Sequence, residues 1–118
     1  MEKIGGKYIM KKIAMISQPM NGKTEQEILK TREKAMSVLT EKGYKVVNTF
    51  FTVEWYSDEN MKKRKVIQIP LCFLAKSLDK MSKCHAVYFC KGWENARGCR
   101  IEYEAAKAYG LDIIYEED

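Results

Sequence analysis

The stretch KIAMISQPMNGKTEQEILKTREKAMSVLTEKGYKVVN, residues 12–48, decides the fold. Its beginning, 12–17, is a short apolar run, which is typical of a buried strand. A loop with Pro, Asn and Gly follows at 17–23, and residues 24–27 (TEQE) match a capping box, which predicts the start of a helix. A second apolar run at 44–48 predicts the next strand. This unit therefore predicts two parallel strands joined by a right-handed crossover.

The rest of the chain continues the alternation of helices and strands. Helices are expected at 57–68, at 70–81 and at 99–109, and strands at 85–90 and 111–115. The sequence thus predicts an α/β fold with an open, doubly wound sheet of the Rossmann or flavodoxin type. The sheet should hold four or five mostly parallel strands, with helices on both faces. Numbered along the chain, the strands should take the order 2-1-3-4.

Length and composition indicate one globular domain. The chain has 118 residues, of which 46% are hydrophobic and 31% are charged. We place the domain at 10–118 and treat 1–9 as an N-terminal extension. No apolar run approaches the roughly 18 residues of a membrane span, and a secretory signal is not expected, because Met1 to Met10 contains no long apolar region. We therefore expect a cytoplasmic protein without a membrane partner.

The charged and metal-ligating residues narrow the range of ligands. The net charge is +5, and its densest segment is Lys62-Lys63-Arg64-Lys65. We interpret this segment as a solvated helical face rather than a contact for a nucleic-acid polymer, because no aromatic residues interleave with it. A metal or other cofactor is not expected, since the single His85 and the cysteines lack the spacing of a zinc site. The thiols, expected to be reduced, are Cys72, Cys84, Cys90 and Cys99.

Glu102 is the most informative residue of the last predicted helix. At 100° per residue it falls within the apolar arc of the helix, whereas Glu104 falls among basic residues on the opposite side. A carboxylate on a packing face is costly unless it is paired, hydrogen-bonded or open to a pocket. Glu102 is therefore a candidate nucleophile or sugar-hydroxyl acceptor. The structural alternative is an internal ion pair with an arginine such as Arg97.

In this class of fold, ligands bind beyond the carboxyl ends of the strands. The loops at 17–23, 48–56 and 91–98 occupy that position. Backbone N–H groups and polar side chains in the first loop could donate to an anion, Trp93 could stack on a base, and Arg97 could hold a phosphate. The alternative for the first loop is a plain connecting turn, and the alternative for Trp93 is a side chain that covers the sheet edge. The candidate substrate-binding residues are Ser17, Gln18, Pro19, Met20, Asn21, Gly22, Trp93, Asn95, Arg97 and Gly98.

Three segments together resemble the nucleoside 2-deoxyribosyltransferase superfamily, and more closely its small, often phage-encoded branch of domains of unknown function. The segments are KIAMISQPMNG (12–22), VYFCKGW (87–93) and WENARGCRIEYEAAKAYG (93–110). The resemblance implies that Glu102 attacks C1′ of a deoxyribose and forms a covalent glycosyl-enzyme, which water or a second base resolves. It also implies a homo-oligomer, because members of the superfamily often complete their pocket across an interface.

Three residues depart from the pattern of these enzymes. Ala96 stands where an Asp or Ser contacts the sugar or a 5′-phosphate, His85 where the third strand commonly begins with Asp, and Gln18 where the first loop has a glycine. The expected function is an N-glycosidase or 2-deoxyribosyltransferase with a nucleoside or nucleotide as its ligand.

Two alternatives to this enzyme stay open. One is a non-catalytic nucleotide-binding sensor or sequestering protein. The other is a structural or regulatory partner protein, which is suggested only by the aromatic side chains of Phe50, Phe51, Trp55 and Tyr56.

Overall fold

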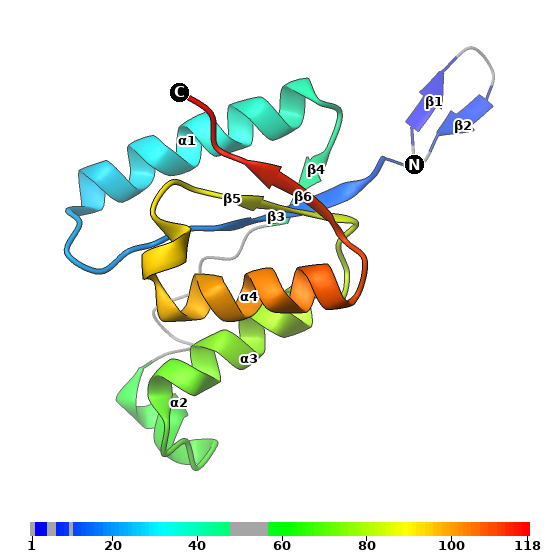
Figure 1. Cartoon of the computed structure of the whole chain (residues 1–118). Helices are drawn as coiled ribbons and strands as arrows, with labels where there is room; N and C mark the ends of the chain where they lie inside the picture. The colour runs from blue at the N-terminus through cyan, green and yellow to red at the C-terminus, as the bar shows by residue number, and fades with distance from the viewer. Residues whose placement is uncertain (1, 5–6, 10, 48–56) are drawn as a thin grey trace.

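The computed structural model of the chain describes residues 2–4, 7–9, 11–47 and 57–118. The main sheet of this described part consists of β3 (Ile13–Ser17), β4 (Lys45–Val46), β5 (Ala86–Phe89) and β6 (Asp112–Tyr115). All three pairings in the sheet are parallel, and the strand order β4-β3-β5-β6 is the predicted order 2-1-3-4 (Figure 1). The predicted α/β fold with a parallel sheet is confirmed.

Helices cover both faces of this sheet, as predicted. Helix α1 lies on one face, and α3 and α4 lie on the other (Figure 1). The helices are α1 (Glu25–Glu41), α2 (Asp58–Lys63), α3 (Ile69–Met81) and α4 (Arg97–Ala108), and a single 3₁₀ turn, η1 (Trp93–Asn95), precedes α4. Thr24 is the N-cap of α1, as the predicted capping box requires, and its hydroxyl accepts a hydrogen bond from the Glu27 N–H at 3.1 Å.

Two helix boundaries differ from the prediction. The helix expected at 57–68 ends at Lys63, because Lys65 takes a left-handed conformation with φ of 55° that a right-handed helix cannot include. The last helix begins at Arg97, two residues earlier than predicted, because the extended Ala96 serves as its N-cap. Gly98 is consequently part of the first helical turn rather than part of the loop.

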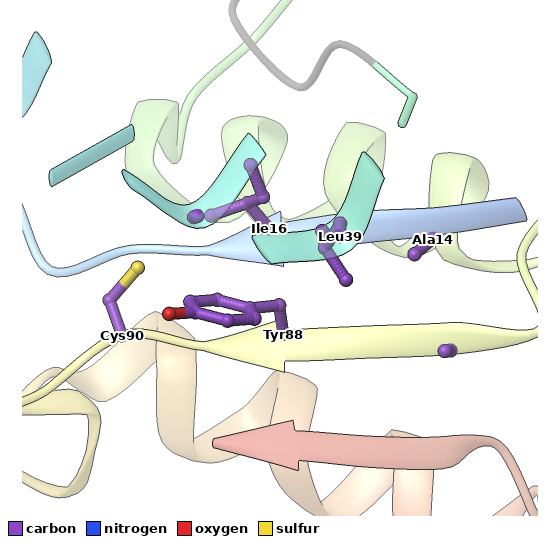
Figure 2. Close-up of a cluster of buried hydrophobic side chains, with 7 residues drawn as sticks. Ala14, Ile16, Leu39, Tyr88 and Cys90 are labelled. Atoms are coloured by element: carbon purple, nitrogen blue, oxygen red, sulfur yellow. The ribbon is translucent and has the colours of Figure 1, made fainter. Parts of the chain in front are cut away.

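The alternation of side chains along the strands produces two apolar cores, one on each face of the sheet. The core under α1 contains Ala14, Ile16, Leu39, Tyr88 and Cys90, which Figure 2 shows, together with Ala35 and Ala86. The core under α3 and α4 contains Met15, Met81, Val87, Phe89 and Ala106. Odd-numbered positions of β3 therefore face α3 and α4, and even-numbered positions face α1.

The N-terminal extension forms an element that the sequence did not predict. Strands β1 (Glu2–Ile4) and β2 (Lys7–Ile9) pair antiparallel as a two-stranded sheet of their own. Figure 1 shows this hairpin standing away from the main sheet, next to the start of β3. None of the described helices is both long and apolar enough to cross a membrane.

Candidate functional site

Glu102 lies in the second turn of α4 and is buried, with 8% of its surface exposed, whereas Glu104 is exposed. The predicted contrast between the two acids is therefore confirmed. The reason is the helical spacing, since the buried residues of α4 are Cys99, Glu102 and Ala106, which share one face. That face packs on β5, so the Glu102 carboxyl group is held within the protein.

The hydroxyl of Ser17 contacts this carboxyl group. Ser17 is the last residue of β3 and has only 1% of its surface exposed. Its odd position directs the side chain toward α4, where Oγ donates a hydrogen bond to Glu102 Oε1 at 3.2 Å. The pair joins residues that are 85 positions apart in the sequence, at the carboxyl edge of the sheet.

Burial raises the pKa of Glu102 to about 7, and the hydrogen bond from Ser17 opposes this rise. Among the described residues no cation forms an ion pair with Glu102, and Arg97 is exposed at the start of α4. The internal ion pair that we considered as the structural alternative is thus absent from the described part of the chain. Near neutral pH the Glu102 carboxyl group therefore exists in both its protonated and its ionised form.

Cys99 is a neighbour of this pair whose place in the site the sequence analysis missed. It lies one turn before Glu102, is 4% exposed, and interacts with both Ser17 and Glu102. Burial raises the pKa of its thiol to about 11, so the group is a neutral sulfhydryl at pH 7. The i, i+3 spacing to Glu102 was the available signal, but a small apolar residue at that position is equally typical of a packed core.

The structure brings the two predicted ligand loops side by side. The Cys90 N–H donates to the Ser17 carbonyl oxygen at 3.0 Å, and a Cβ atom built on Gly92 would lie 3.8 Å from Cγ of Pro19. Gly92 has φ of +88°, a conformation that side chains with a Cβ rarely take. The loops after β3 and β5 therefore form one continuous edge beside Glu102.

Gly98 adjoins open space one turn before Glu102. A Cβ atom built on Gly98 meets no heavy atom within 4 Å. The first turn of α4 therefore leaves open space where another residue would place a side chain.

The other predicted binding residues occupy the same edge with different degrees of exposure. Trp93 is half-buried and stacks on Tyr103 with ring centroids 4.2 Å apart, and it also packs against Phe89 at 5.5 Å. One face of its indole ring is therefore occupied, as in our alternative of a Trp that covers the sheet edge; stacking of the other face on a base stays a prediction. Pro19 is half-buried, and the exposed residues of the set are Met20, Asn21, Gly22, Asn95 and Arg97. The loop at 48–56, with Phe50, Phe51, Trp55 and Tyr56, lies outside the described residues.

The structure shows the surroundings of His85 and Ala96, two of the three residues that differ from the pattern of the deoxyribosyltransferases. His85 precedes β5 at the amino edge of the sheet, opposite to Glu102, and its Nδ1 accepts a hydrogen bond from the Ile13 N–H at 2.9 Å. The His85 side chain therefore bonds to the backbone of the sheet, at the edge away from Glu102. Ala96 is the N-cap of α4 and provides no side-chain oxygen there.

No group of three or more His, Cys, Asp or Glu side chains that could hold a metal ion occurs in the described part of the chain. All four cysteines are free thiols. Burial raises the pKa of Cys84 to about 11 and that of Cys90 to about 12, which makes both poor metal ligands and poor nucleophiles at neutral pH.

Comparison with known proteins identifies a family for this chain but no individual relative. No curated protein and no solved structure matches the chain. A family model described as "Domain of unknown function (DUF4406)" matches residues 12–115, which include all four strands of the main sheet as well as Ser17 and Glu102. The chain therefore belongs to the DUF4406 family.

Proposed function

We propose that the protein is an N-glycosidase or 2-deoxyribosyltransferase that acts on a nucleoside or nucleotide, with Glu102 as the nucleophile. The observation that carries the proposal is the buried Glu102 carboxyl group at the carboxyl edge of the sheet, hydrogen-bonded by Ser17 and next to the open position at Gly98. A buried carboxyl group without an ion pair is costly for stability, which is typical of groups kept for chemistry. The resemblance of residues 93–110 to the deoxyribosyltransferases supplies the reaction class.

The proposed reaction has two displacements at C1′ of the sugar. In the first, an ionised oxygen of Glu102 forms a bond to C1′, the C1′–N bond breaks, and its electron pair leaves with the base, which takes up a proton. In the second, water or a nitrogen of another base bonds to C1′ and loses a proton. The ester bond then breaks and restores the carboxylate.

Ser17 would act as a positioning residue in this scheme. Its hydrogen bond to Oε1 fixes the orientation of the carboxyl group and leaves Oε2 as the attacking atom. The same hydrogen bond favours the ionised form, because it opposes the rise in the pKa of Glu102 that burial causes.

The test is release of free base from a panel of 2′-deoxynucleosides and their 5′-monophosphates, measured by chromatography. Glu102→Gln should abolish release while nucleotide binding, measured by calorimetry, stays within about tenfold of the parent. Gln keeps the shape and the hydrogen bond from Ser17 but cannot form the ester. Glu104→Gln is the matched control and should leave the rate unchanged, since Glu104 is exposed on the same helix. Equal rates for the parent and Glu102→Gln would overturn the assignment.

The second candidate is a nucleotide-binding protein without turnover, such as a sensor or a sequestering protein. Two observations favour it: Ala96 provides no polar side chain at the start of α4, and a pKa near 7 leaves much of Glu102 protonated at neutral pH. The same assay decides between the candidates. Binding by the parent without release of base would support the second and exclude the first.

A further inference from the structure

Gln18 has an amide group whose orientation the structure fixes. It is the first residue after β3, and 9% of its surface is exposed. Its Nε2 donates a hydrogen bond to the carbonyl oxygen of Ile28 in α1, 2.7 Å away. A carbonyl oxygen can only accept, so an amide turned by 180° would place two acceptors against each other. The other end of the amide, Oε1, is therefore an acceptor.

This acceptor, Gln18 Oε1, is buried. No residue in the described part of the chain donates a hydrogen bond to Gln18 Oε1. Buried polar atoms are nearly always hydrogen-bonded, and leaving one without a partner is costly. A ligand that supplied a donor at this point would therefore gain more affinity than it would from the same contact at an exposed site.

The position of Gln18 connects it to the proposed catalytic site. Ser17 and Gln18 are consecutive, and their side chains leave β3 on opposite faces, Ser17 toward Glu102 on α4 and Gln18 toward α1. A ligand whose sugar lies at Glu102 and which extends over the end of β3 toward α1 thus comes to Gln18. Because Gln18 Oε1 is buried, access of a ligand to it requires a shift of the neighbouring loop. The turn at 20–23 in this loop is exposed and is closed by a long hydrogen bond of 3.3 Å from the Lys23 N–H to the Met20 carbonyl oxygen.

We propose that Gln18 is a specificity-determining residue of the nucleoside site, and that its Oε1 accepts a hydrogen bond from an N–H or O–H donor of the ligand. The inference rests on the proposed function and adds a selection rule to it. The donor is either an amino group of the base or a hydroxyl group of the sugar. The sequence alone suggested the opposite role, a side-chain donor, because it does not reveal that the Ile28 carbonyl oxygen occupies the amide N–H.

The experiment measures binding by calorimetry in the Glu102→Gln background, where no turnover occurs. Two ligand pairs distinguish the sources of the donor: 2′-deoxyadenosine against purine 2′-deoxyriboside, which lacks the amino group, and 2′-deoxyadenosine against 2′,3′-dideoxyadenosine, which lacks the 3′-hydroxyl group. With Gln18 in place, loss of the relevant donor should weaken binding by roughly 10- to 100-fold. With Gln18→Met, both members of that pair should bind with equal, weaker affinity.

Two further variants make the result specific. Gln26→Met changes an exposed glutamine of α1 and should preserve the discrimination. Gln18→Asn is one methylene shorter and cannot both donate to the Ile28 carbonyl oxygen and present its own oxygen at the same point, so it should lose the discrimination as Gln18→Met does. Thermal unfolding monitors whether each variant is folded.

The outcomes separate this inference from the proposed function. Equal discrimination by the Gln18→Met and unsubstituted proteins, or no discrimination within either ligand pair when Gln18 is present, would overturn the role of Gln18 and leave the proposed function intact. Failure of every nucleoside and 5′-monophosphate to bind the parent would overturn the proposed function, and this inference with it.

Discussion

At the scale of single residues, the site depends on a carboxyl group that the fold buries and a hydroxyl group that orients it. Glu102 has lost most of its hydration, which raises its pKa from 4.5 to about 7, while Ser17 supplies one hydrogen bond to its Oε1. The raised pKa has consequences for stability and for activity that can be measured separately.

Glu102 should make folding stability depend on pH. Because its pKa in the folded chain lies above that of the unfolded chain, its contribution to stability is complete below pH 4.5 and is lost as the pH rises through about 7. The shift corresponds to about 3 kcal/mol. The free energy of unfolding of Glu102→Gln, relative to that of the parent, should therefore rise by up to about 3 kcal/mol as the pH is raised from 4 to 8. Denaturant unfolding at several pH values measures the difference, and Glu104→Gln serves as the control. A gain that does not change with pH would contradict burial of an ionisable Glu102.

Ser17→Ala should move the pH dependence of activity upward. Removal of the hydroxyl removes the interaction that lowers the pKa of Glu102, so a higher pH is needed to ionise the nucleophile. We expect the midpoint of the rising limb of kcat/KM against pH, which reports the ligand-free protein, to lie above the parent value near 7. Ser37→Ala, on an exposed position of α1, is the control and should leave the midpoint unchanged. A lower rate with the same midpoint would limit Ser17 to a packing role.

At the scale of elements, α4 combines an interior face with a gap in its first turn. Gly98 is the residue that creates the gap, and a Cβ atom there would meet open space in the ligand-free protein. A substitution of Gly98 can therefore change the stability of the helix and the affinity for a ligand in opposite directions.

Gly98→Ala should stabilise the protein and impair its function at the same time. Ala costs less conformational entropy than Gly in a helix, by roughly 0.5–1 kcal/mol in a helix interior and less in a first turn. Under the proposed function, the ligand reaches Glu102 past Gly98, and the added methyl group would obstruct it, so KM or Kd should rise by about tenfold or more. Thermal unfolding and binding calorimetry measure the two effects. Unchanged ligand affinity in a stabilised Gly98→Ala variant would show that the ligand does not pass this position.

At the scale of the whole molecule, the sequence predicts the sheet well because its signals are local. Short apolar runs separated by a capped helix specify parallel strands, and the crossover rule then limits the strand order. The helical wheel separates Glu102 from Glu104 for the same reason, since both lie on one regular element. These predictions required no knowledge of how distant segments meet.

Long-range contacts were the part that the sequence could not predict. The Ser17–Glu102 hydrogen bond depends on the β3–β5 register, Ser17 against Phe89, and on the position of α4 over the sheet. The role of Gln18 depends on a carbonyl oxygen of α1 that no sequence pattern marks. The start of α4 depends on the extended conformation of Ala96, a poor capping residue that gives no local signal.

The covalent intermediate tests most directly whether Glu102 is the nucleophile. Fluorine at C2′ of a 2′-deoxynucleoside slows both displacements, because it destabilises the positive charge that develops at C1′ in each. The glycosyl-enzyme accumulates when its breakdown becomes the slower step. After incubation of the protein with such analogues of the nucleosides that it cleaves, mass spectrometry of the intact chain should show the added mass of one fluorosugar. Peptide mapping should place this mass on Glu102, and Glu102→Gln should acquire none. A modification on another residue, or base release by the parent without any sugar adduct on Glu102, would contradict the account.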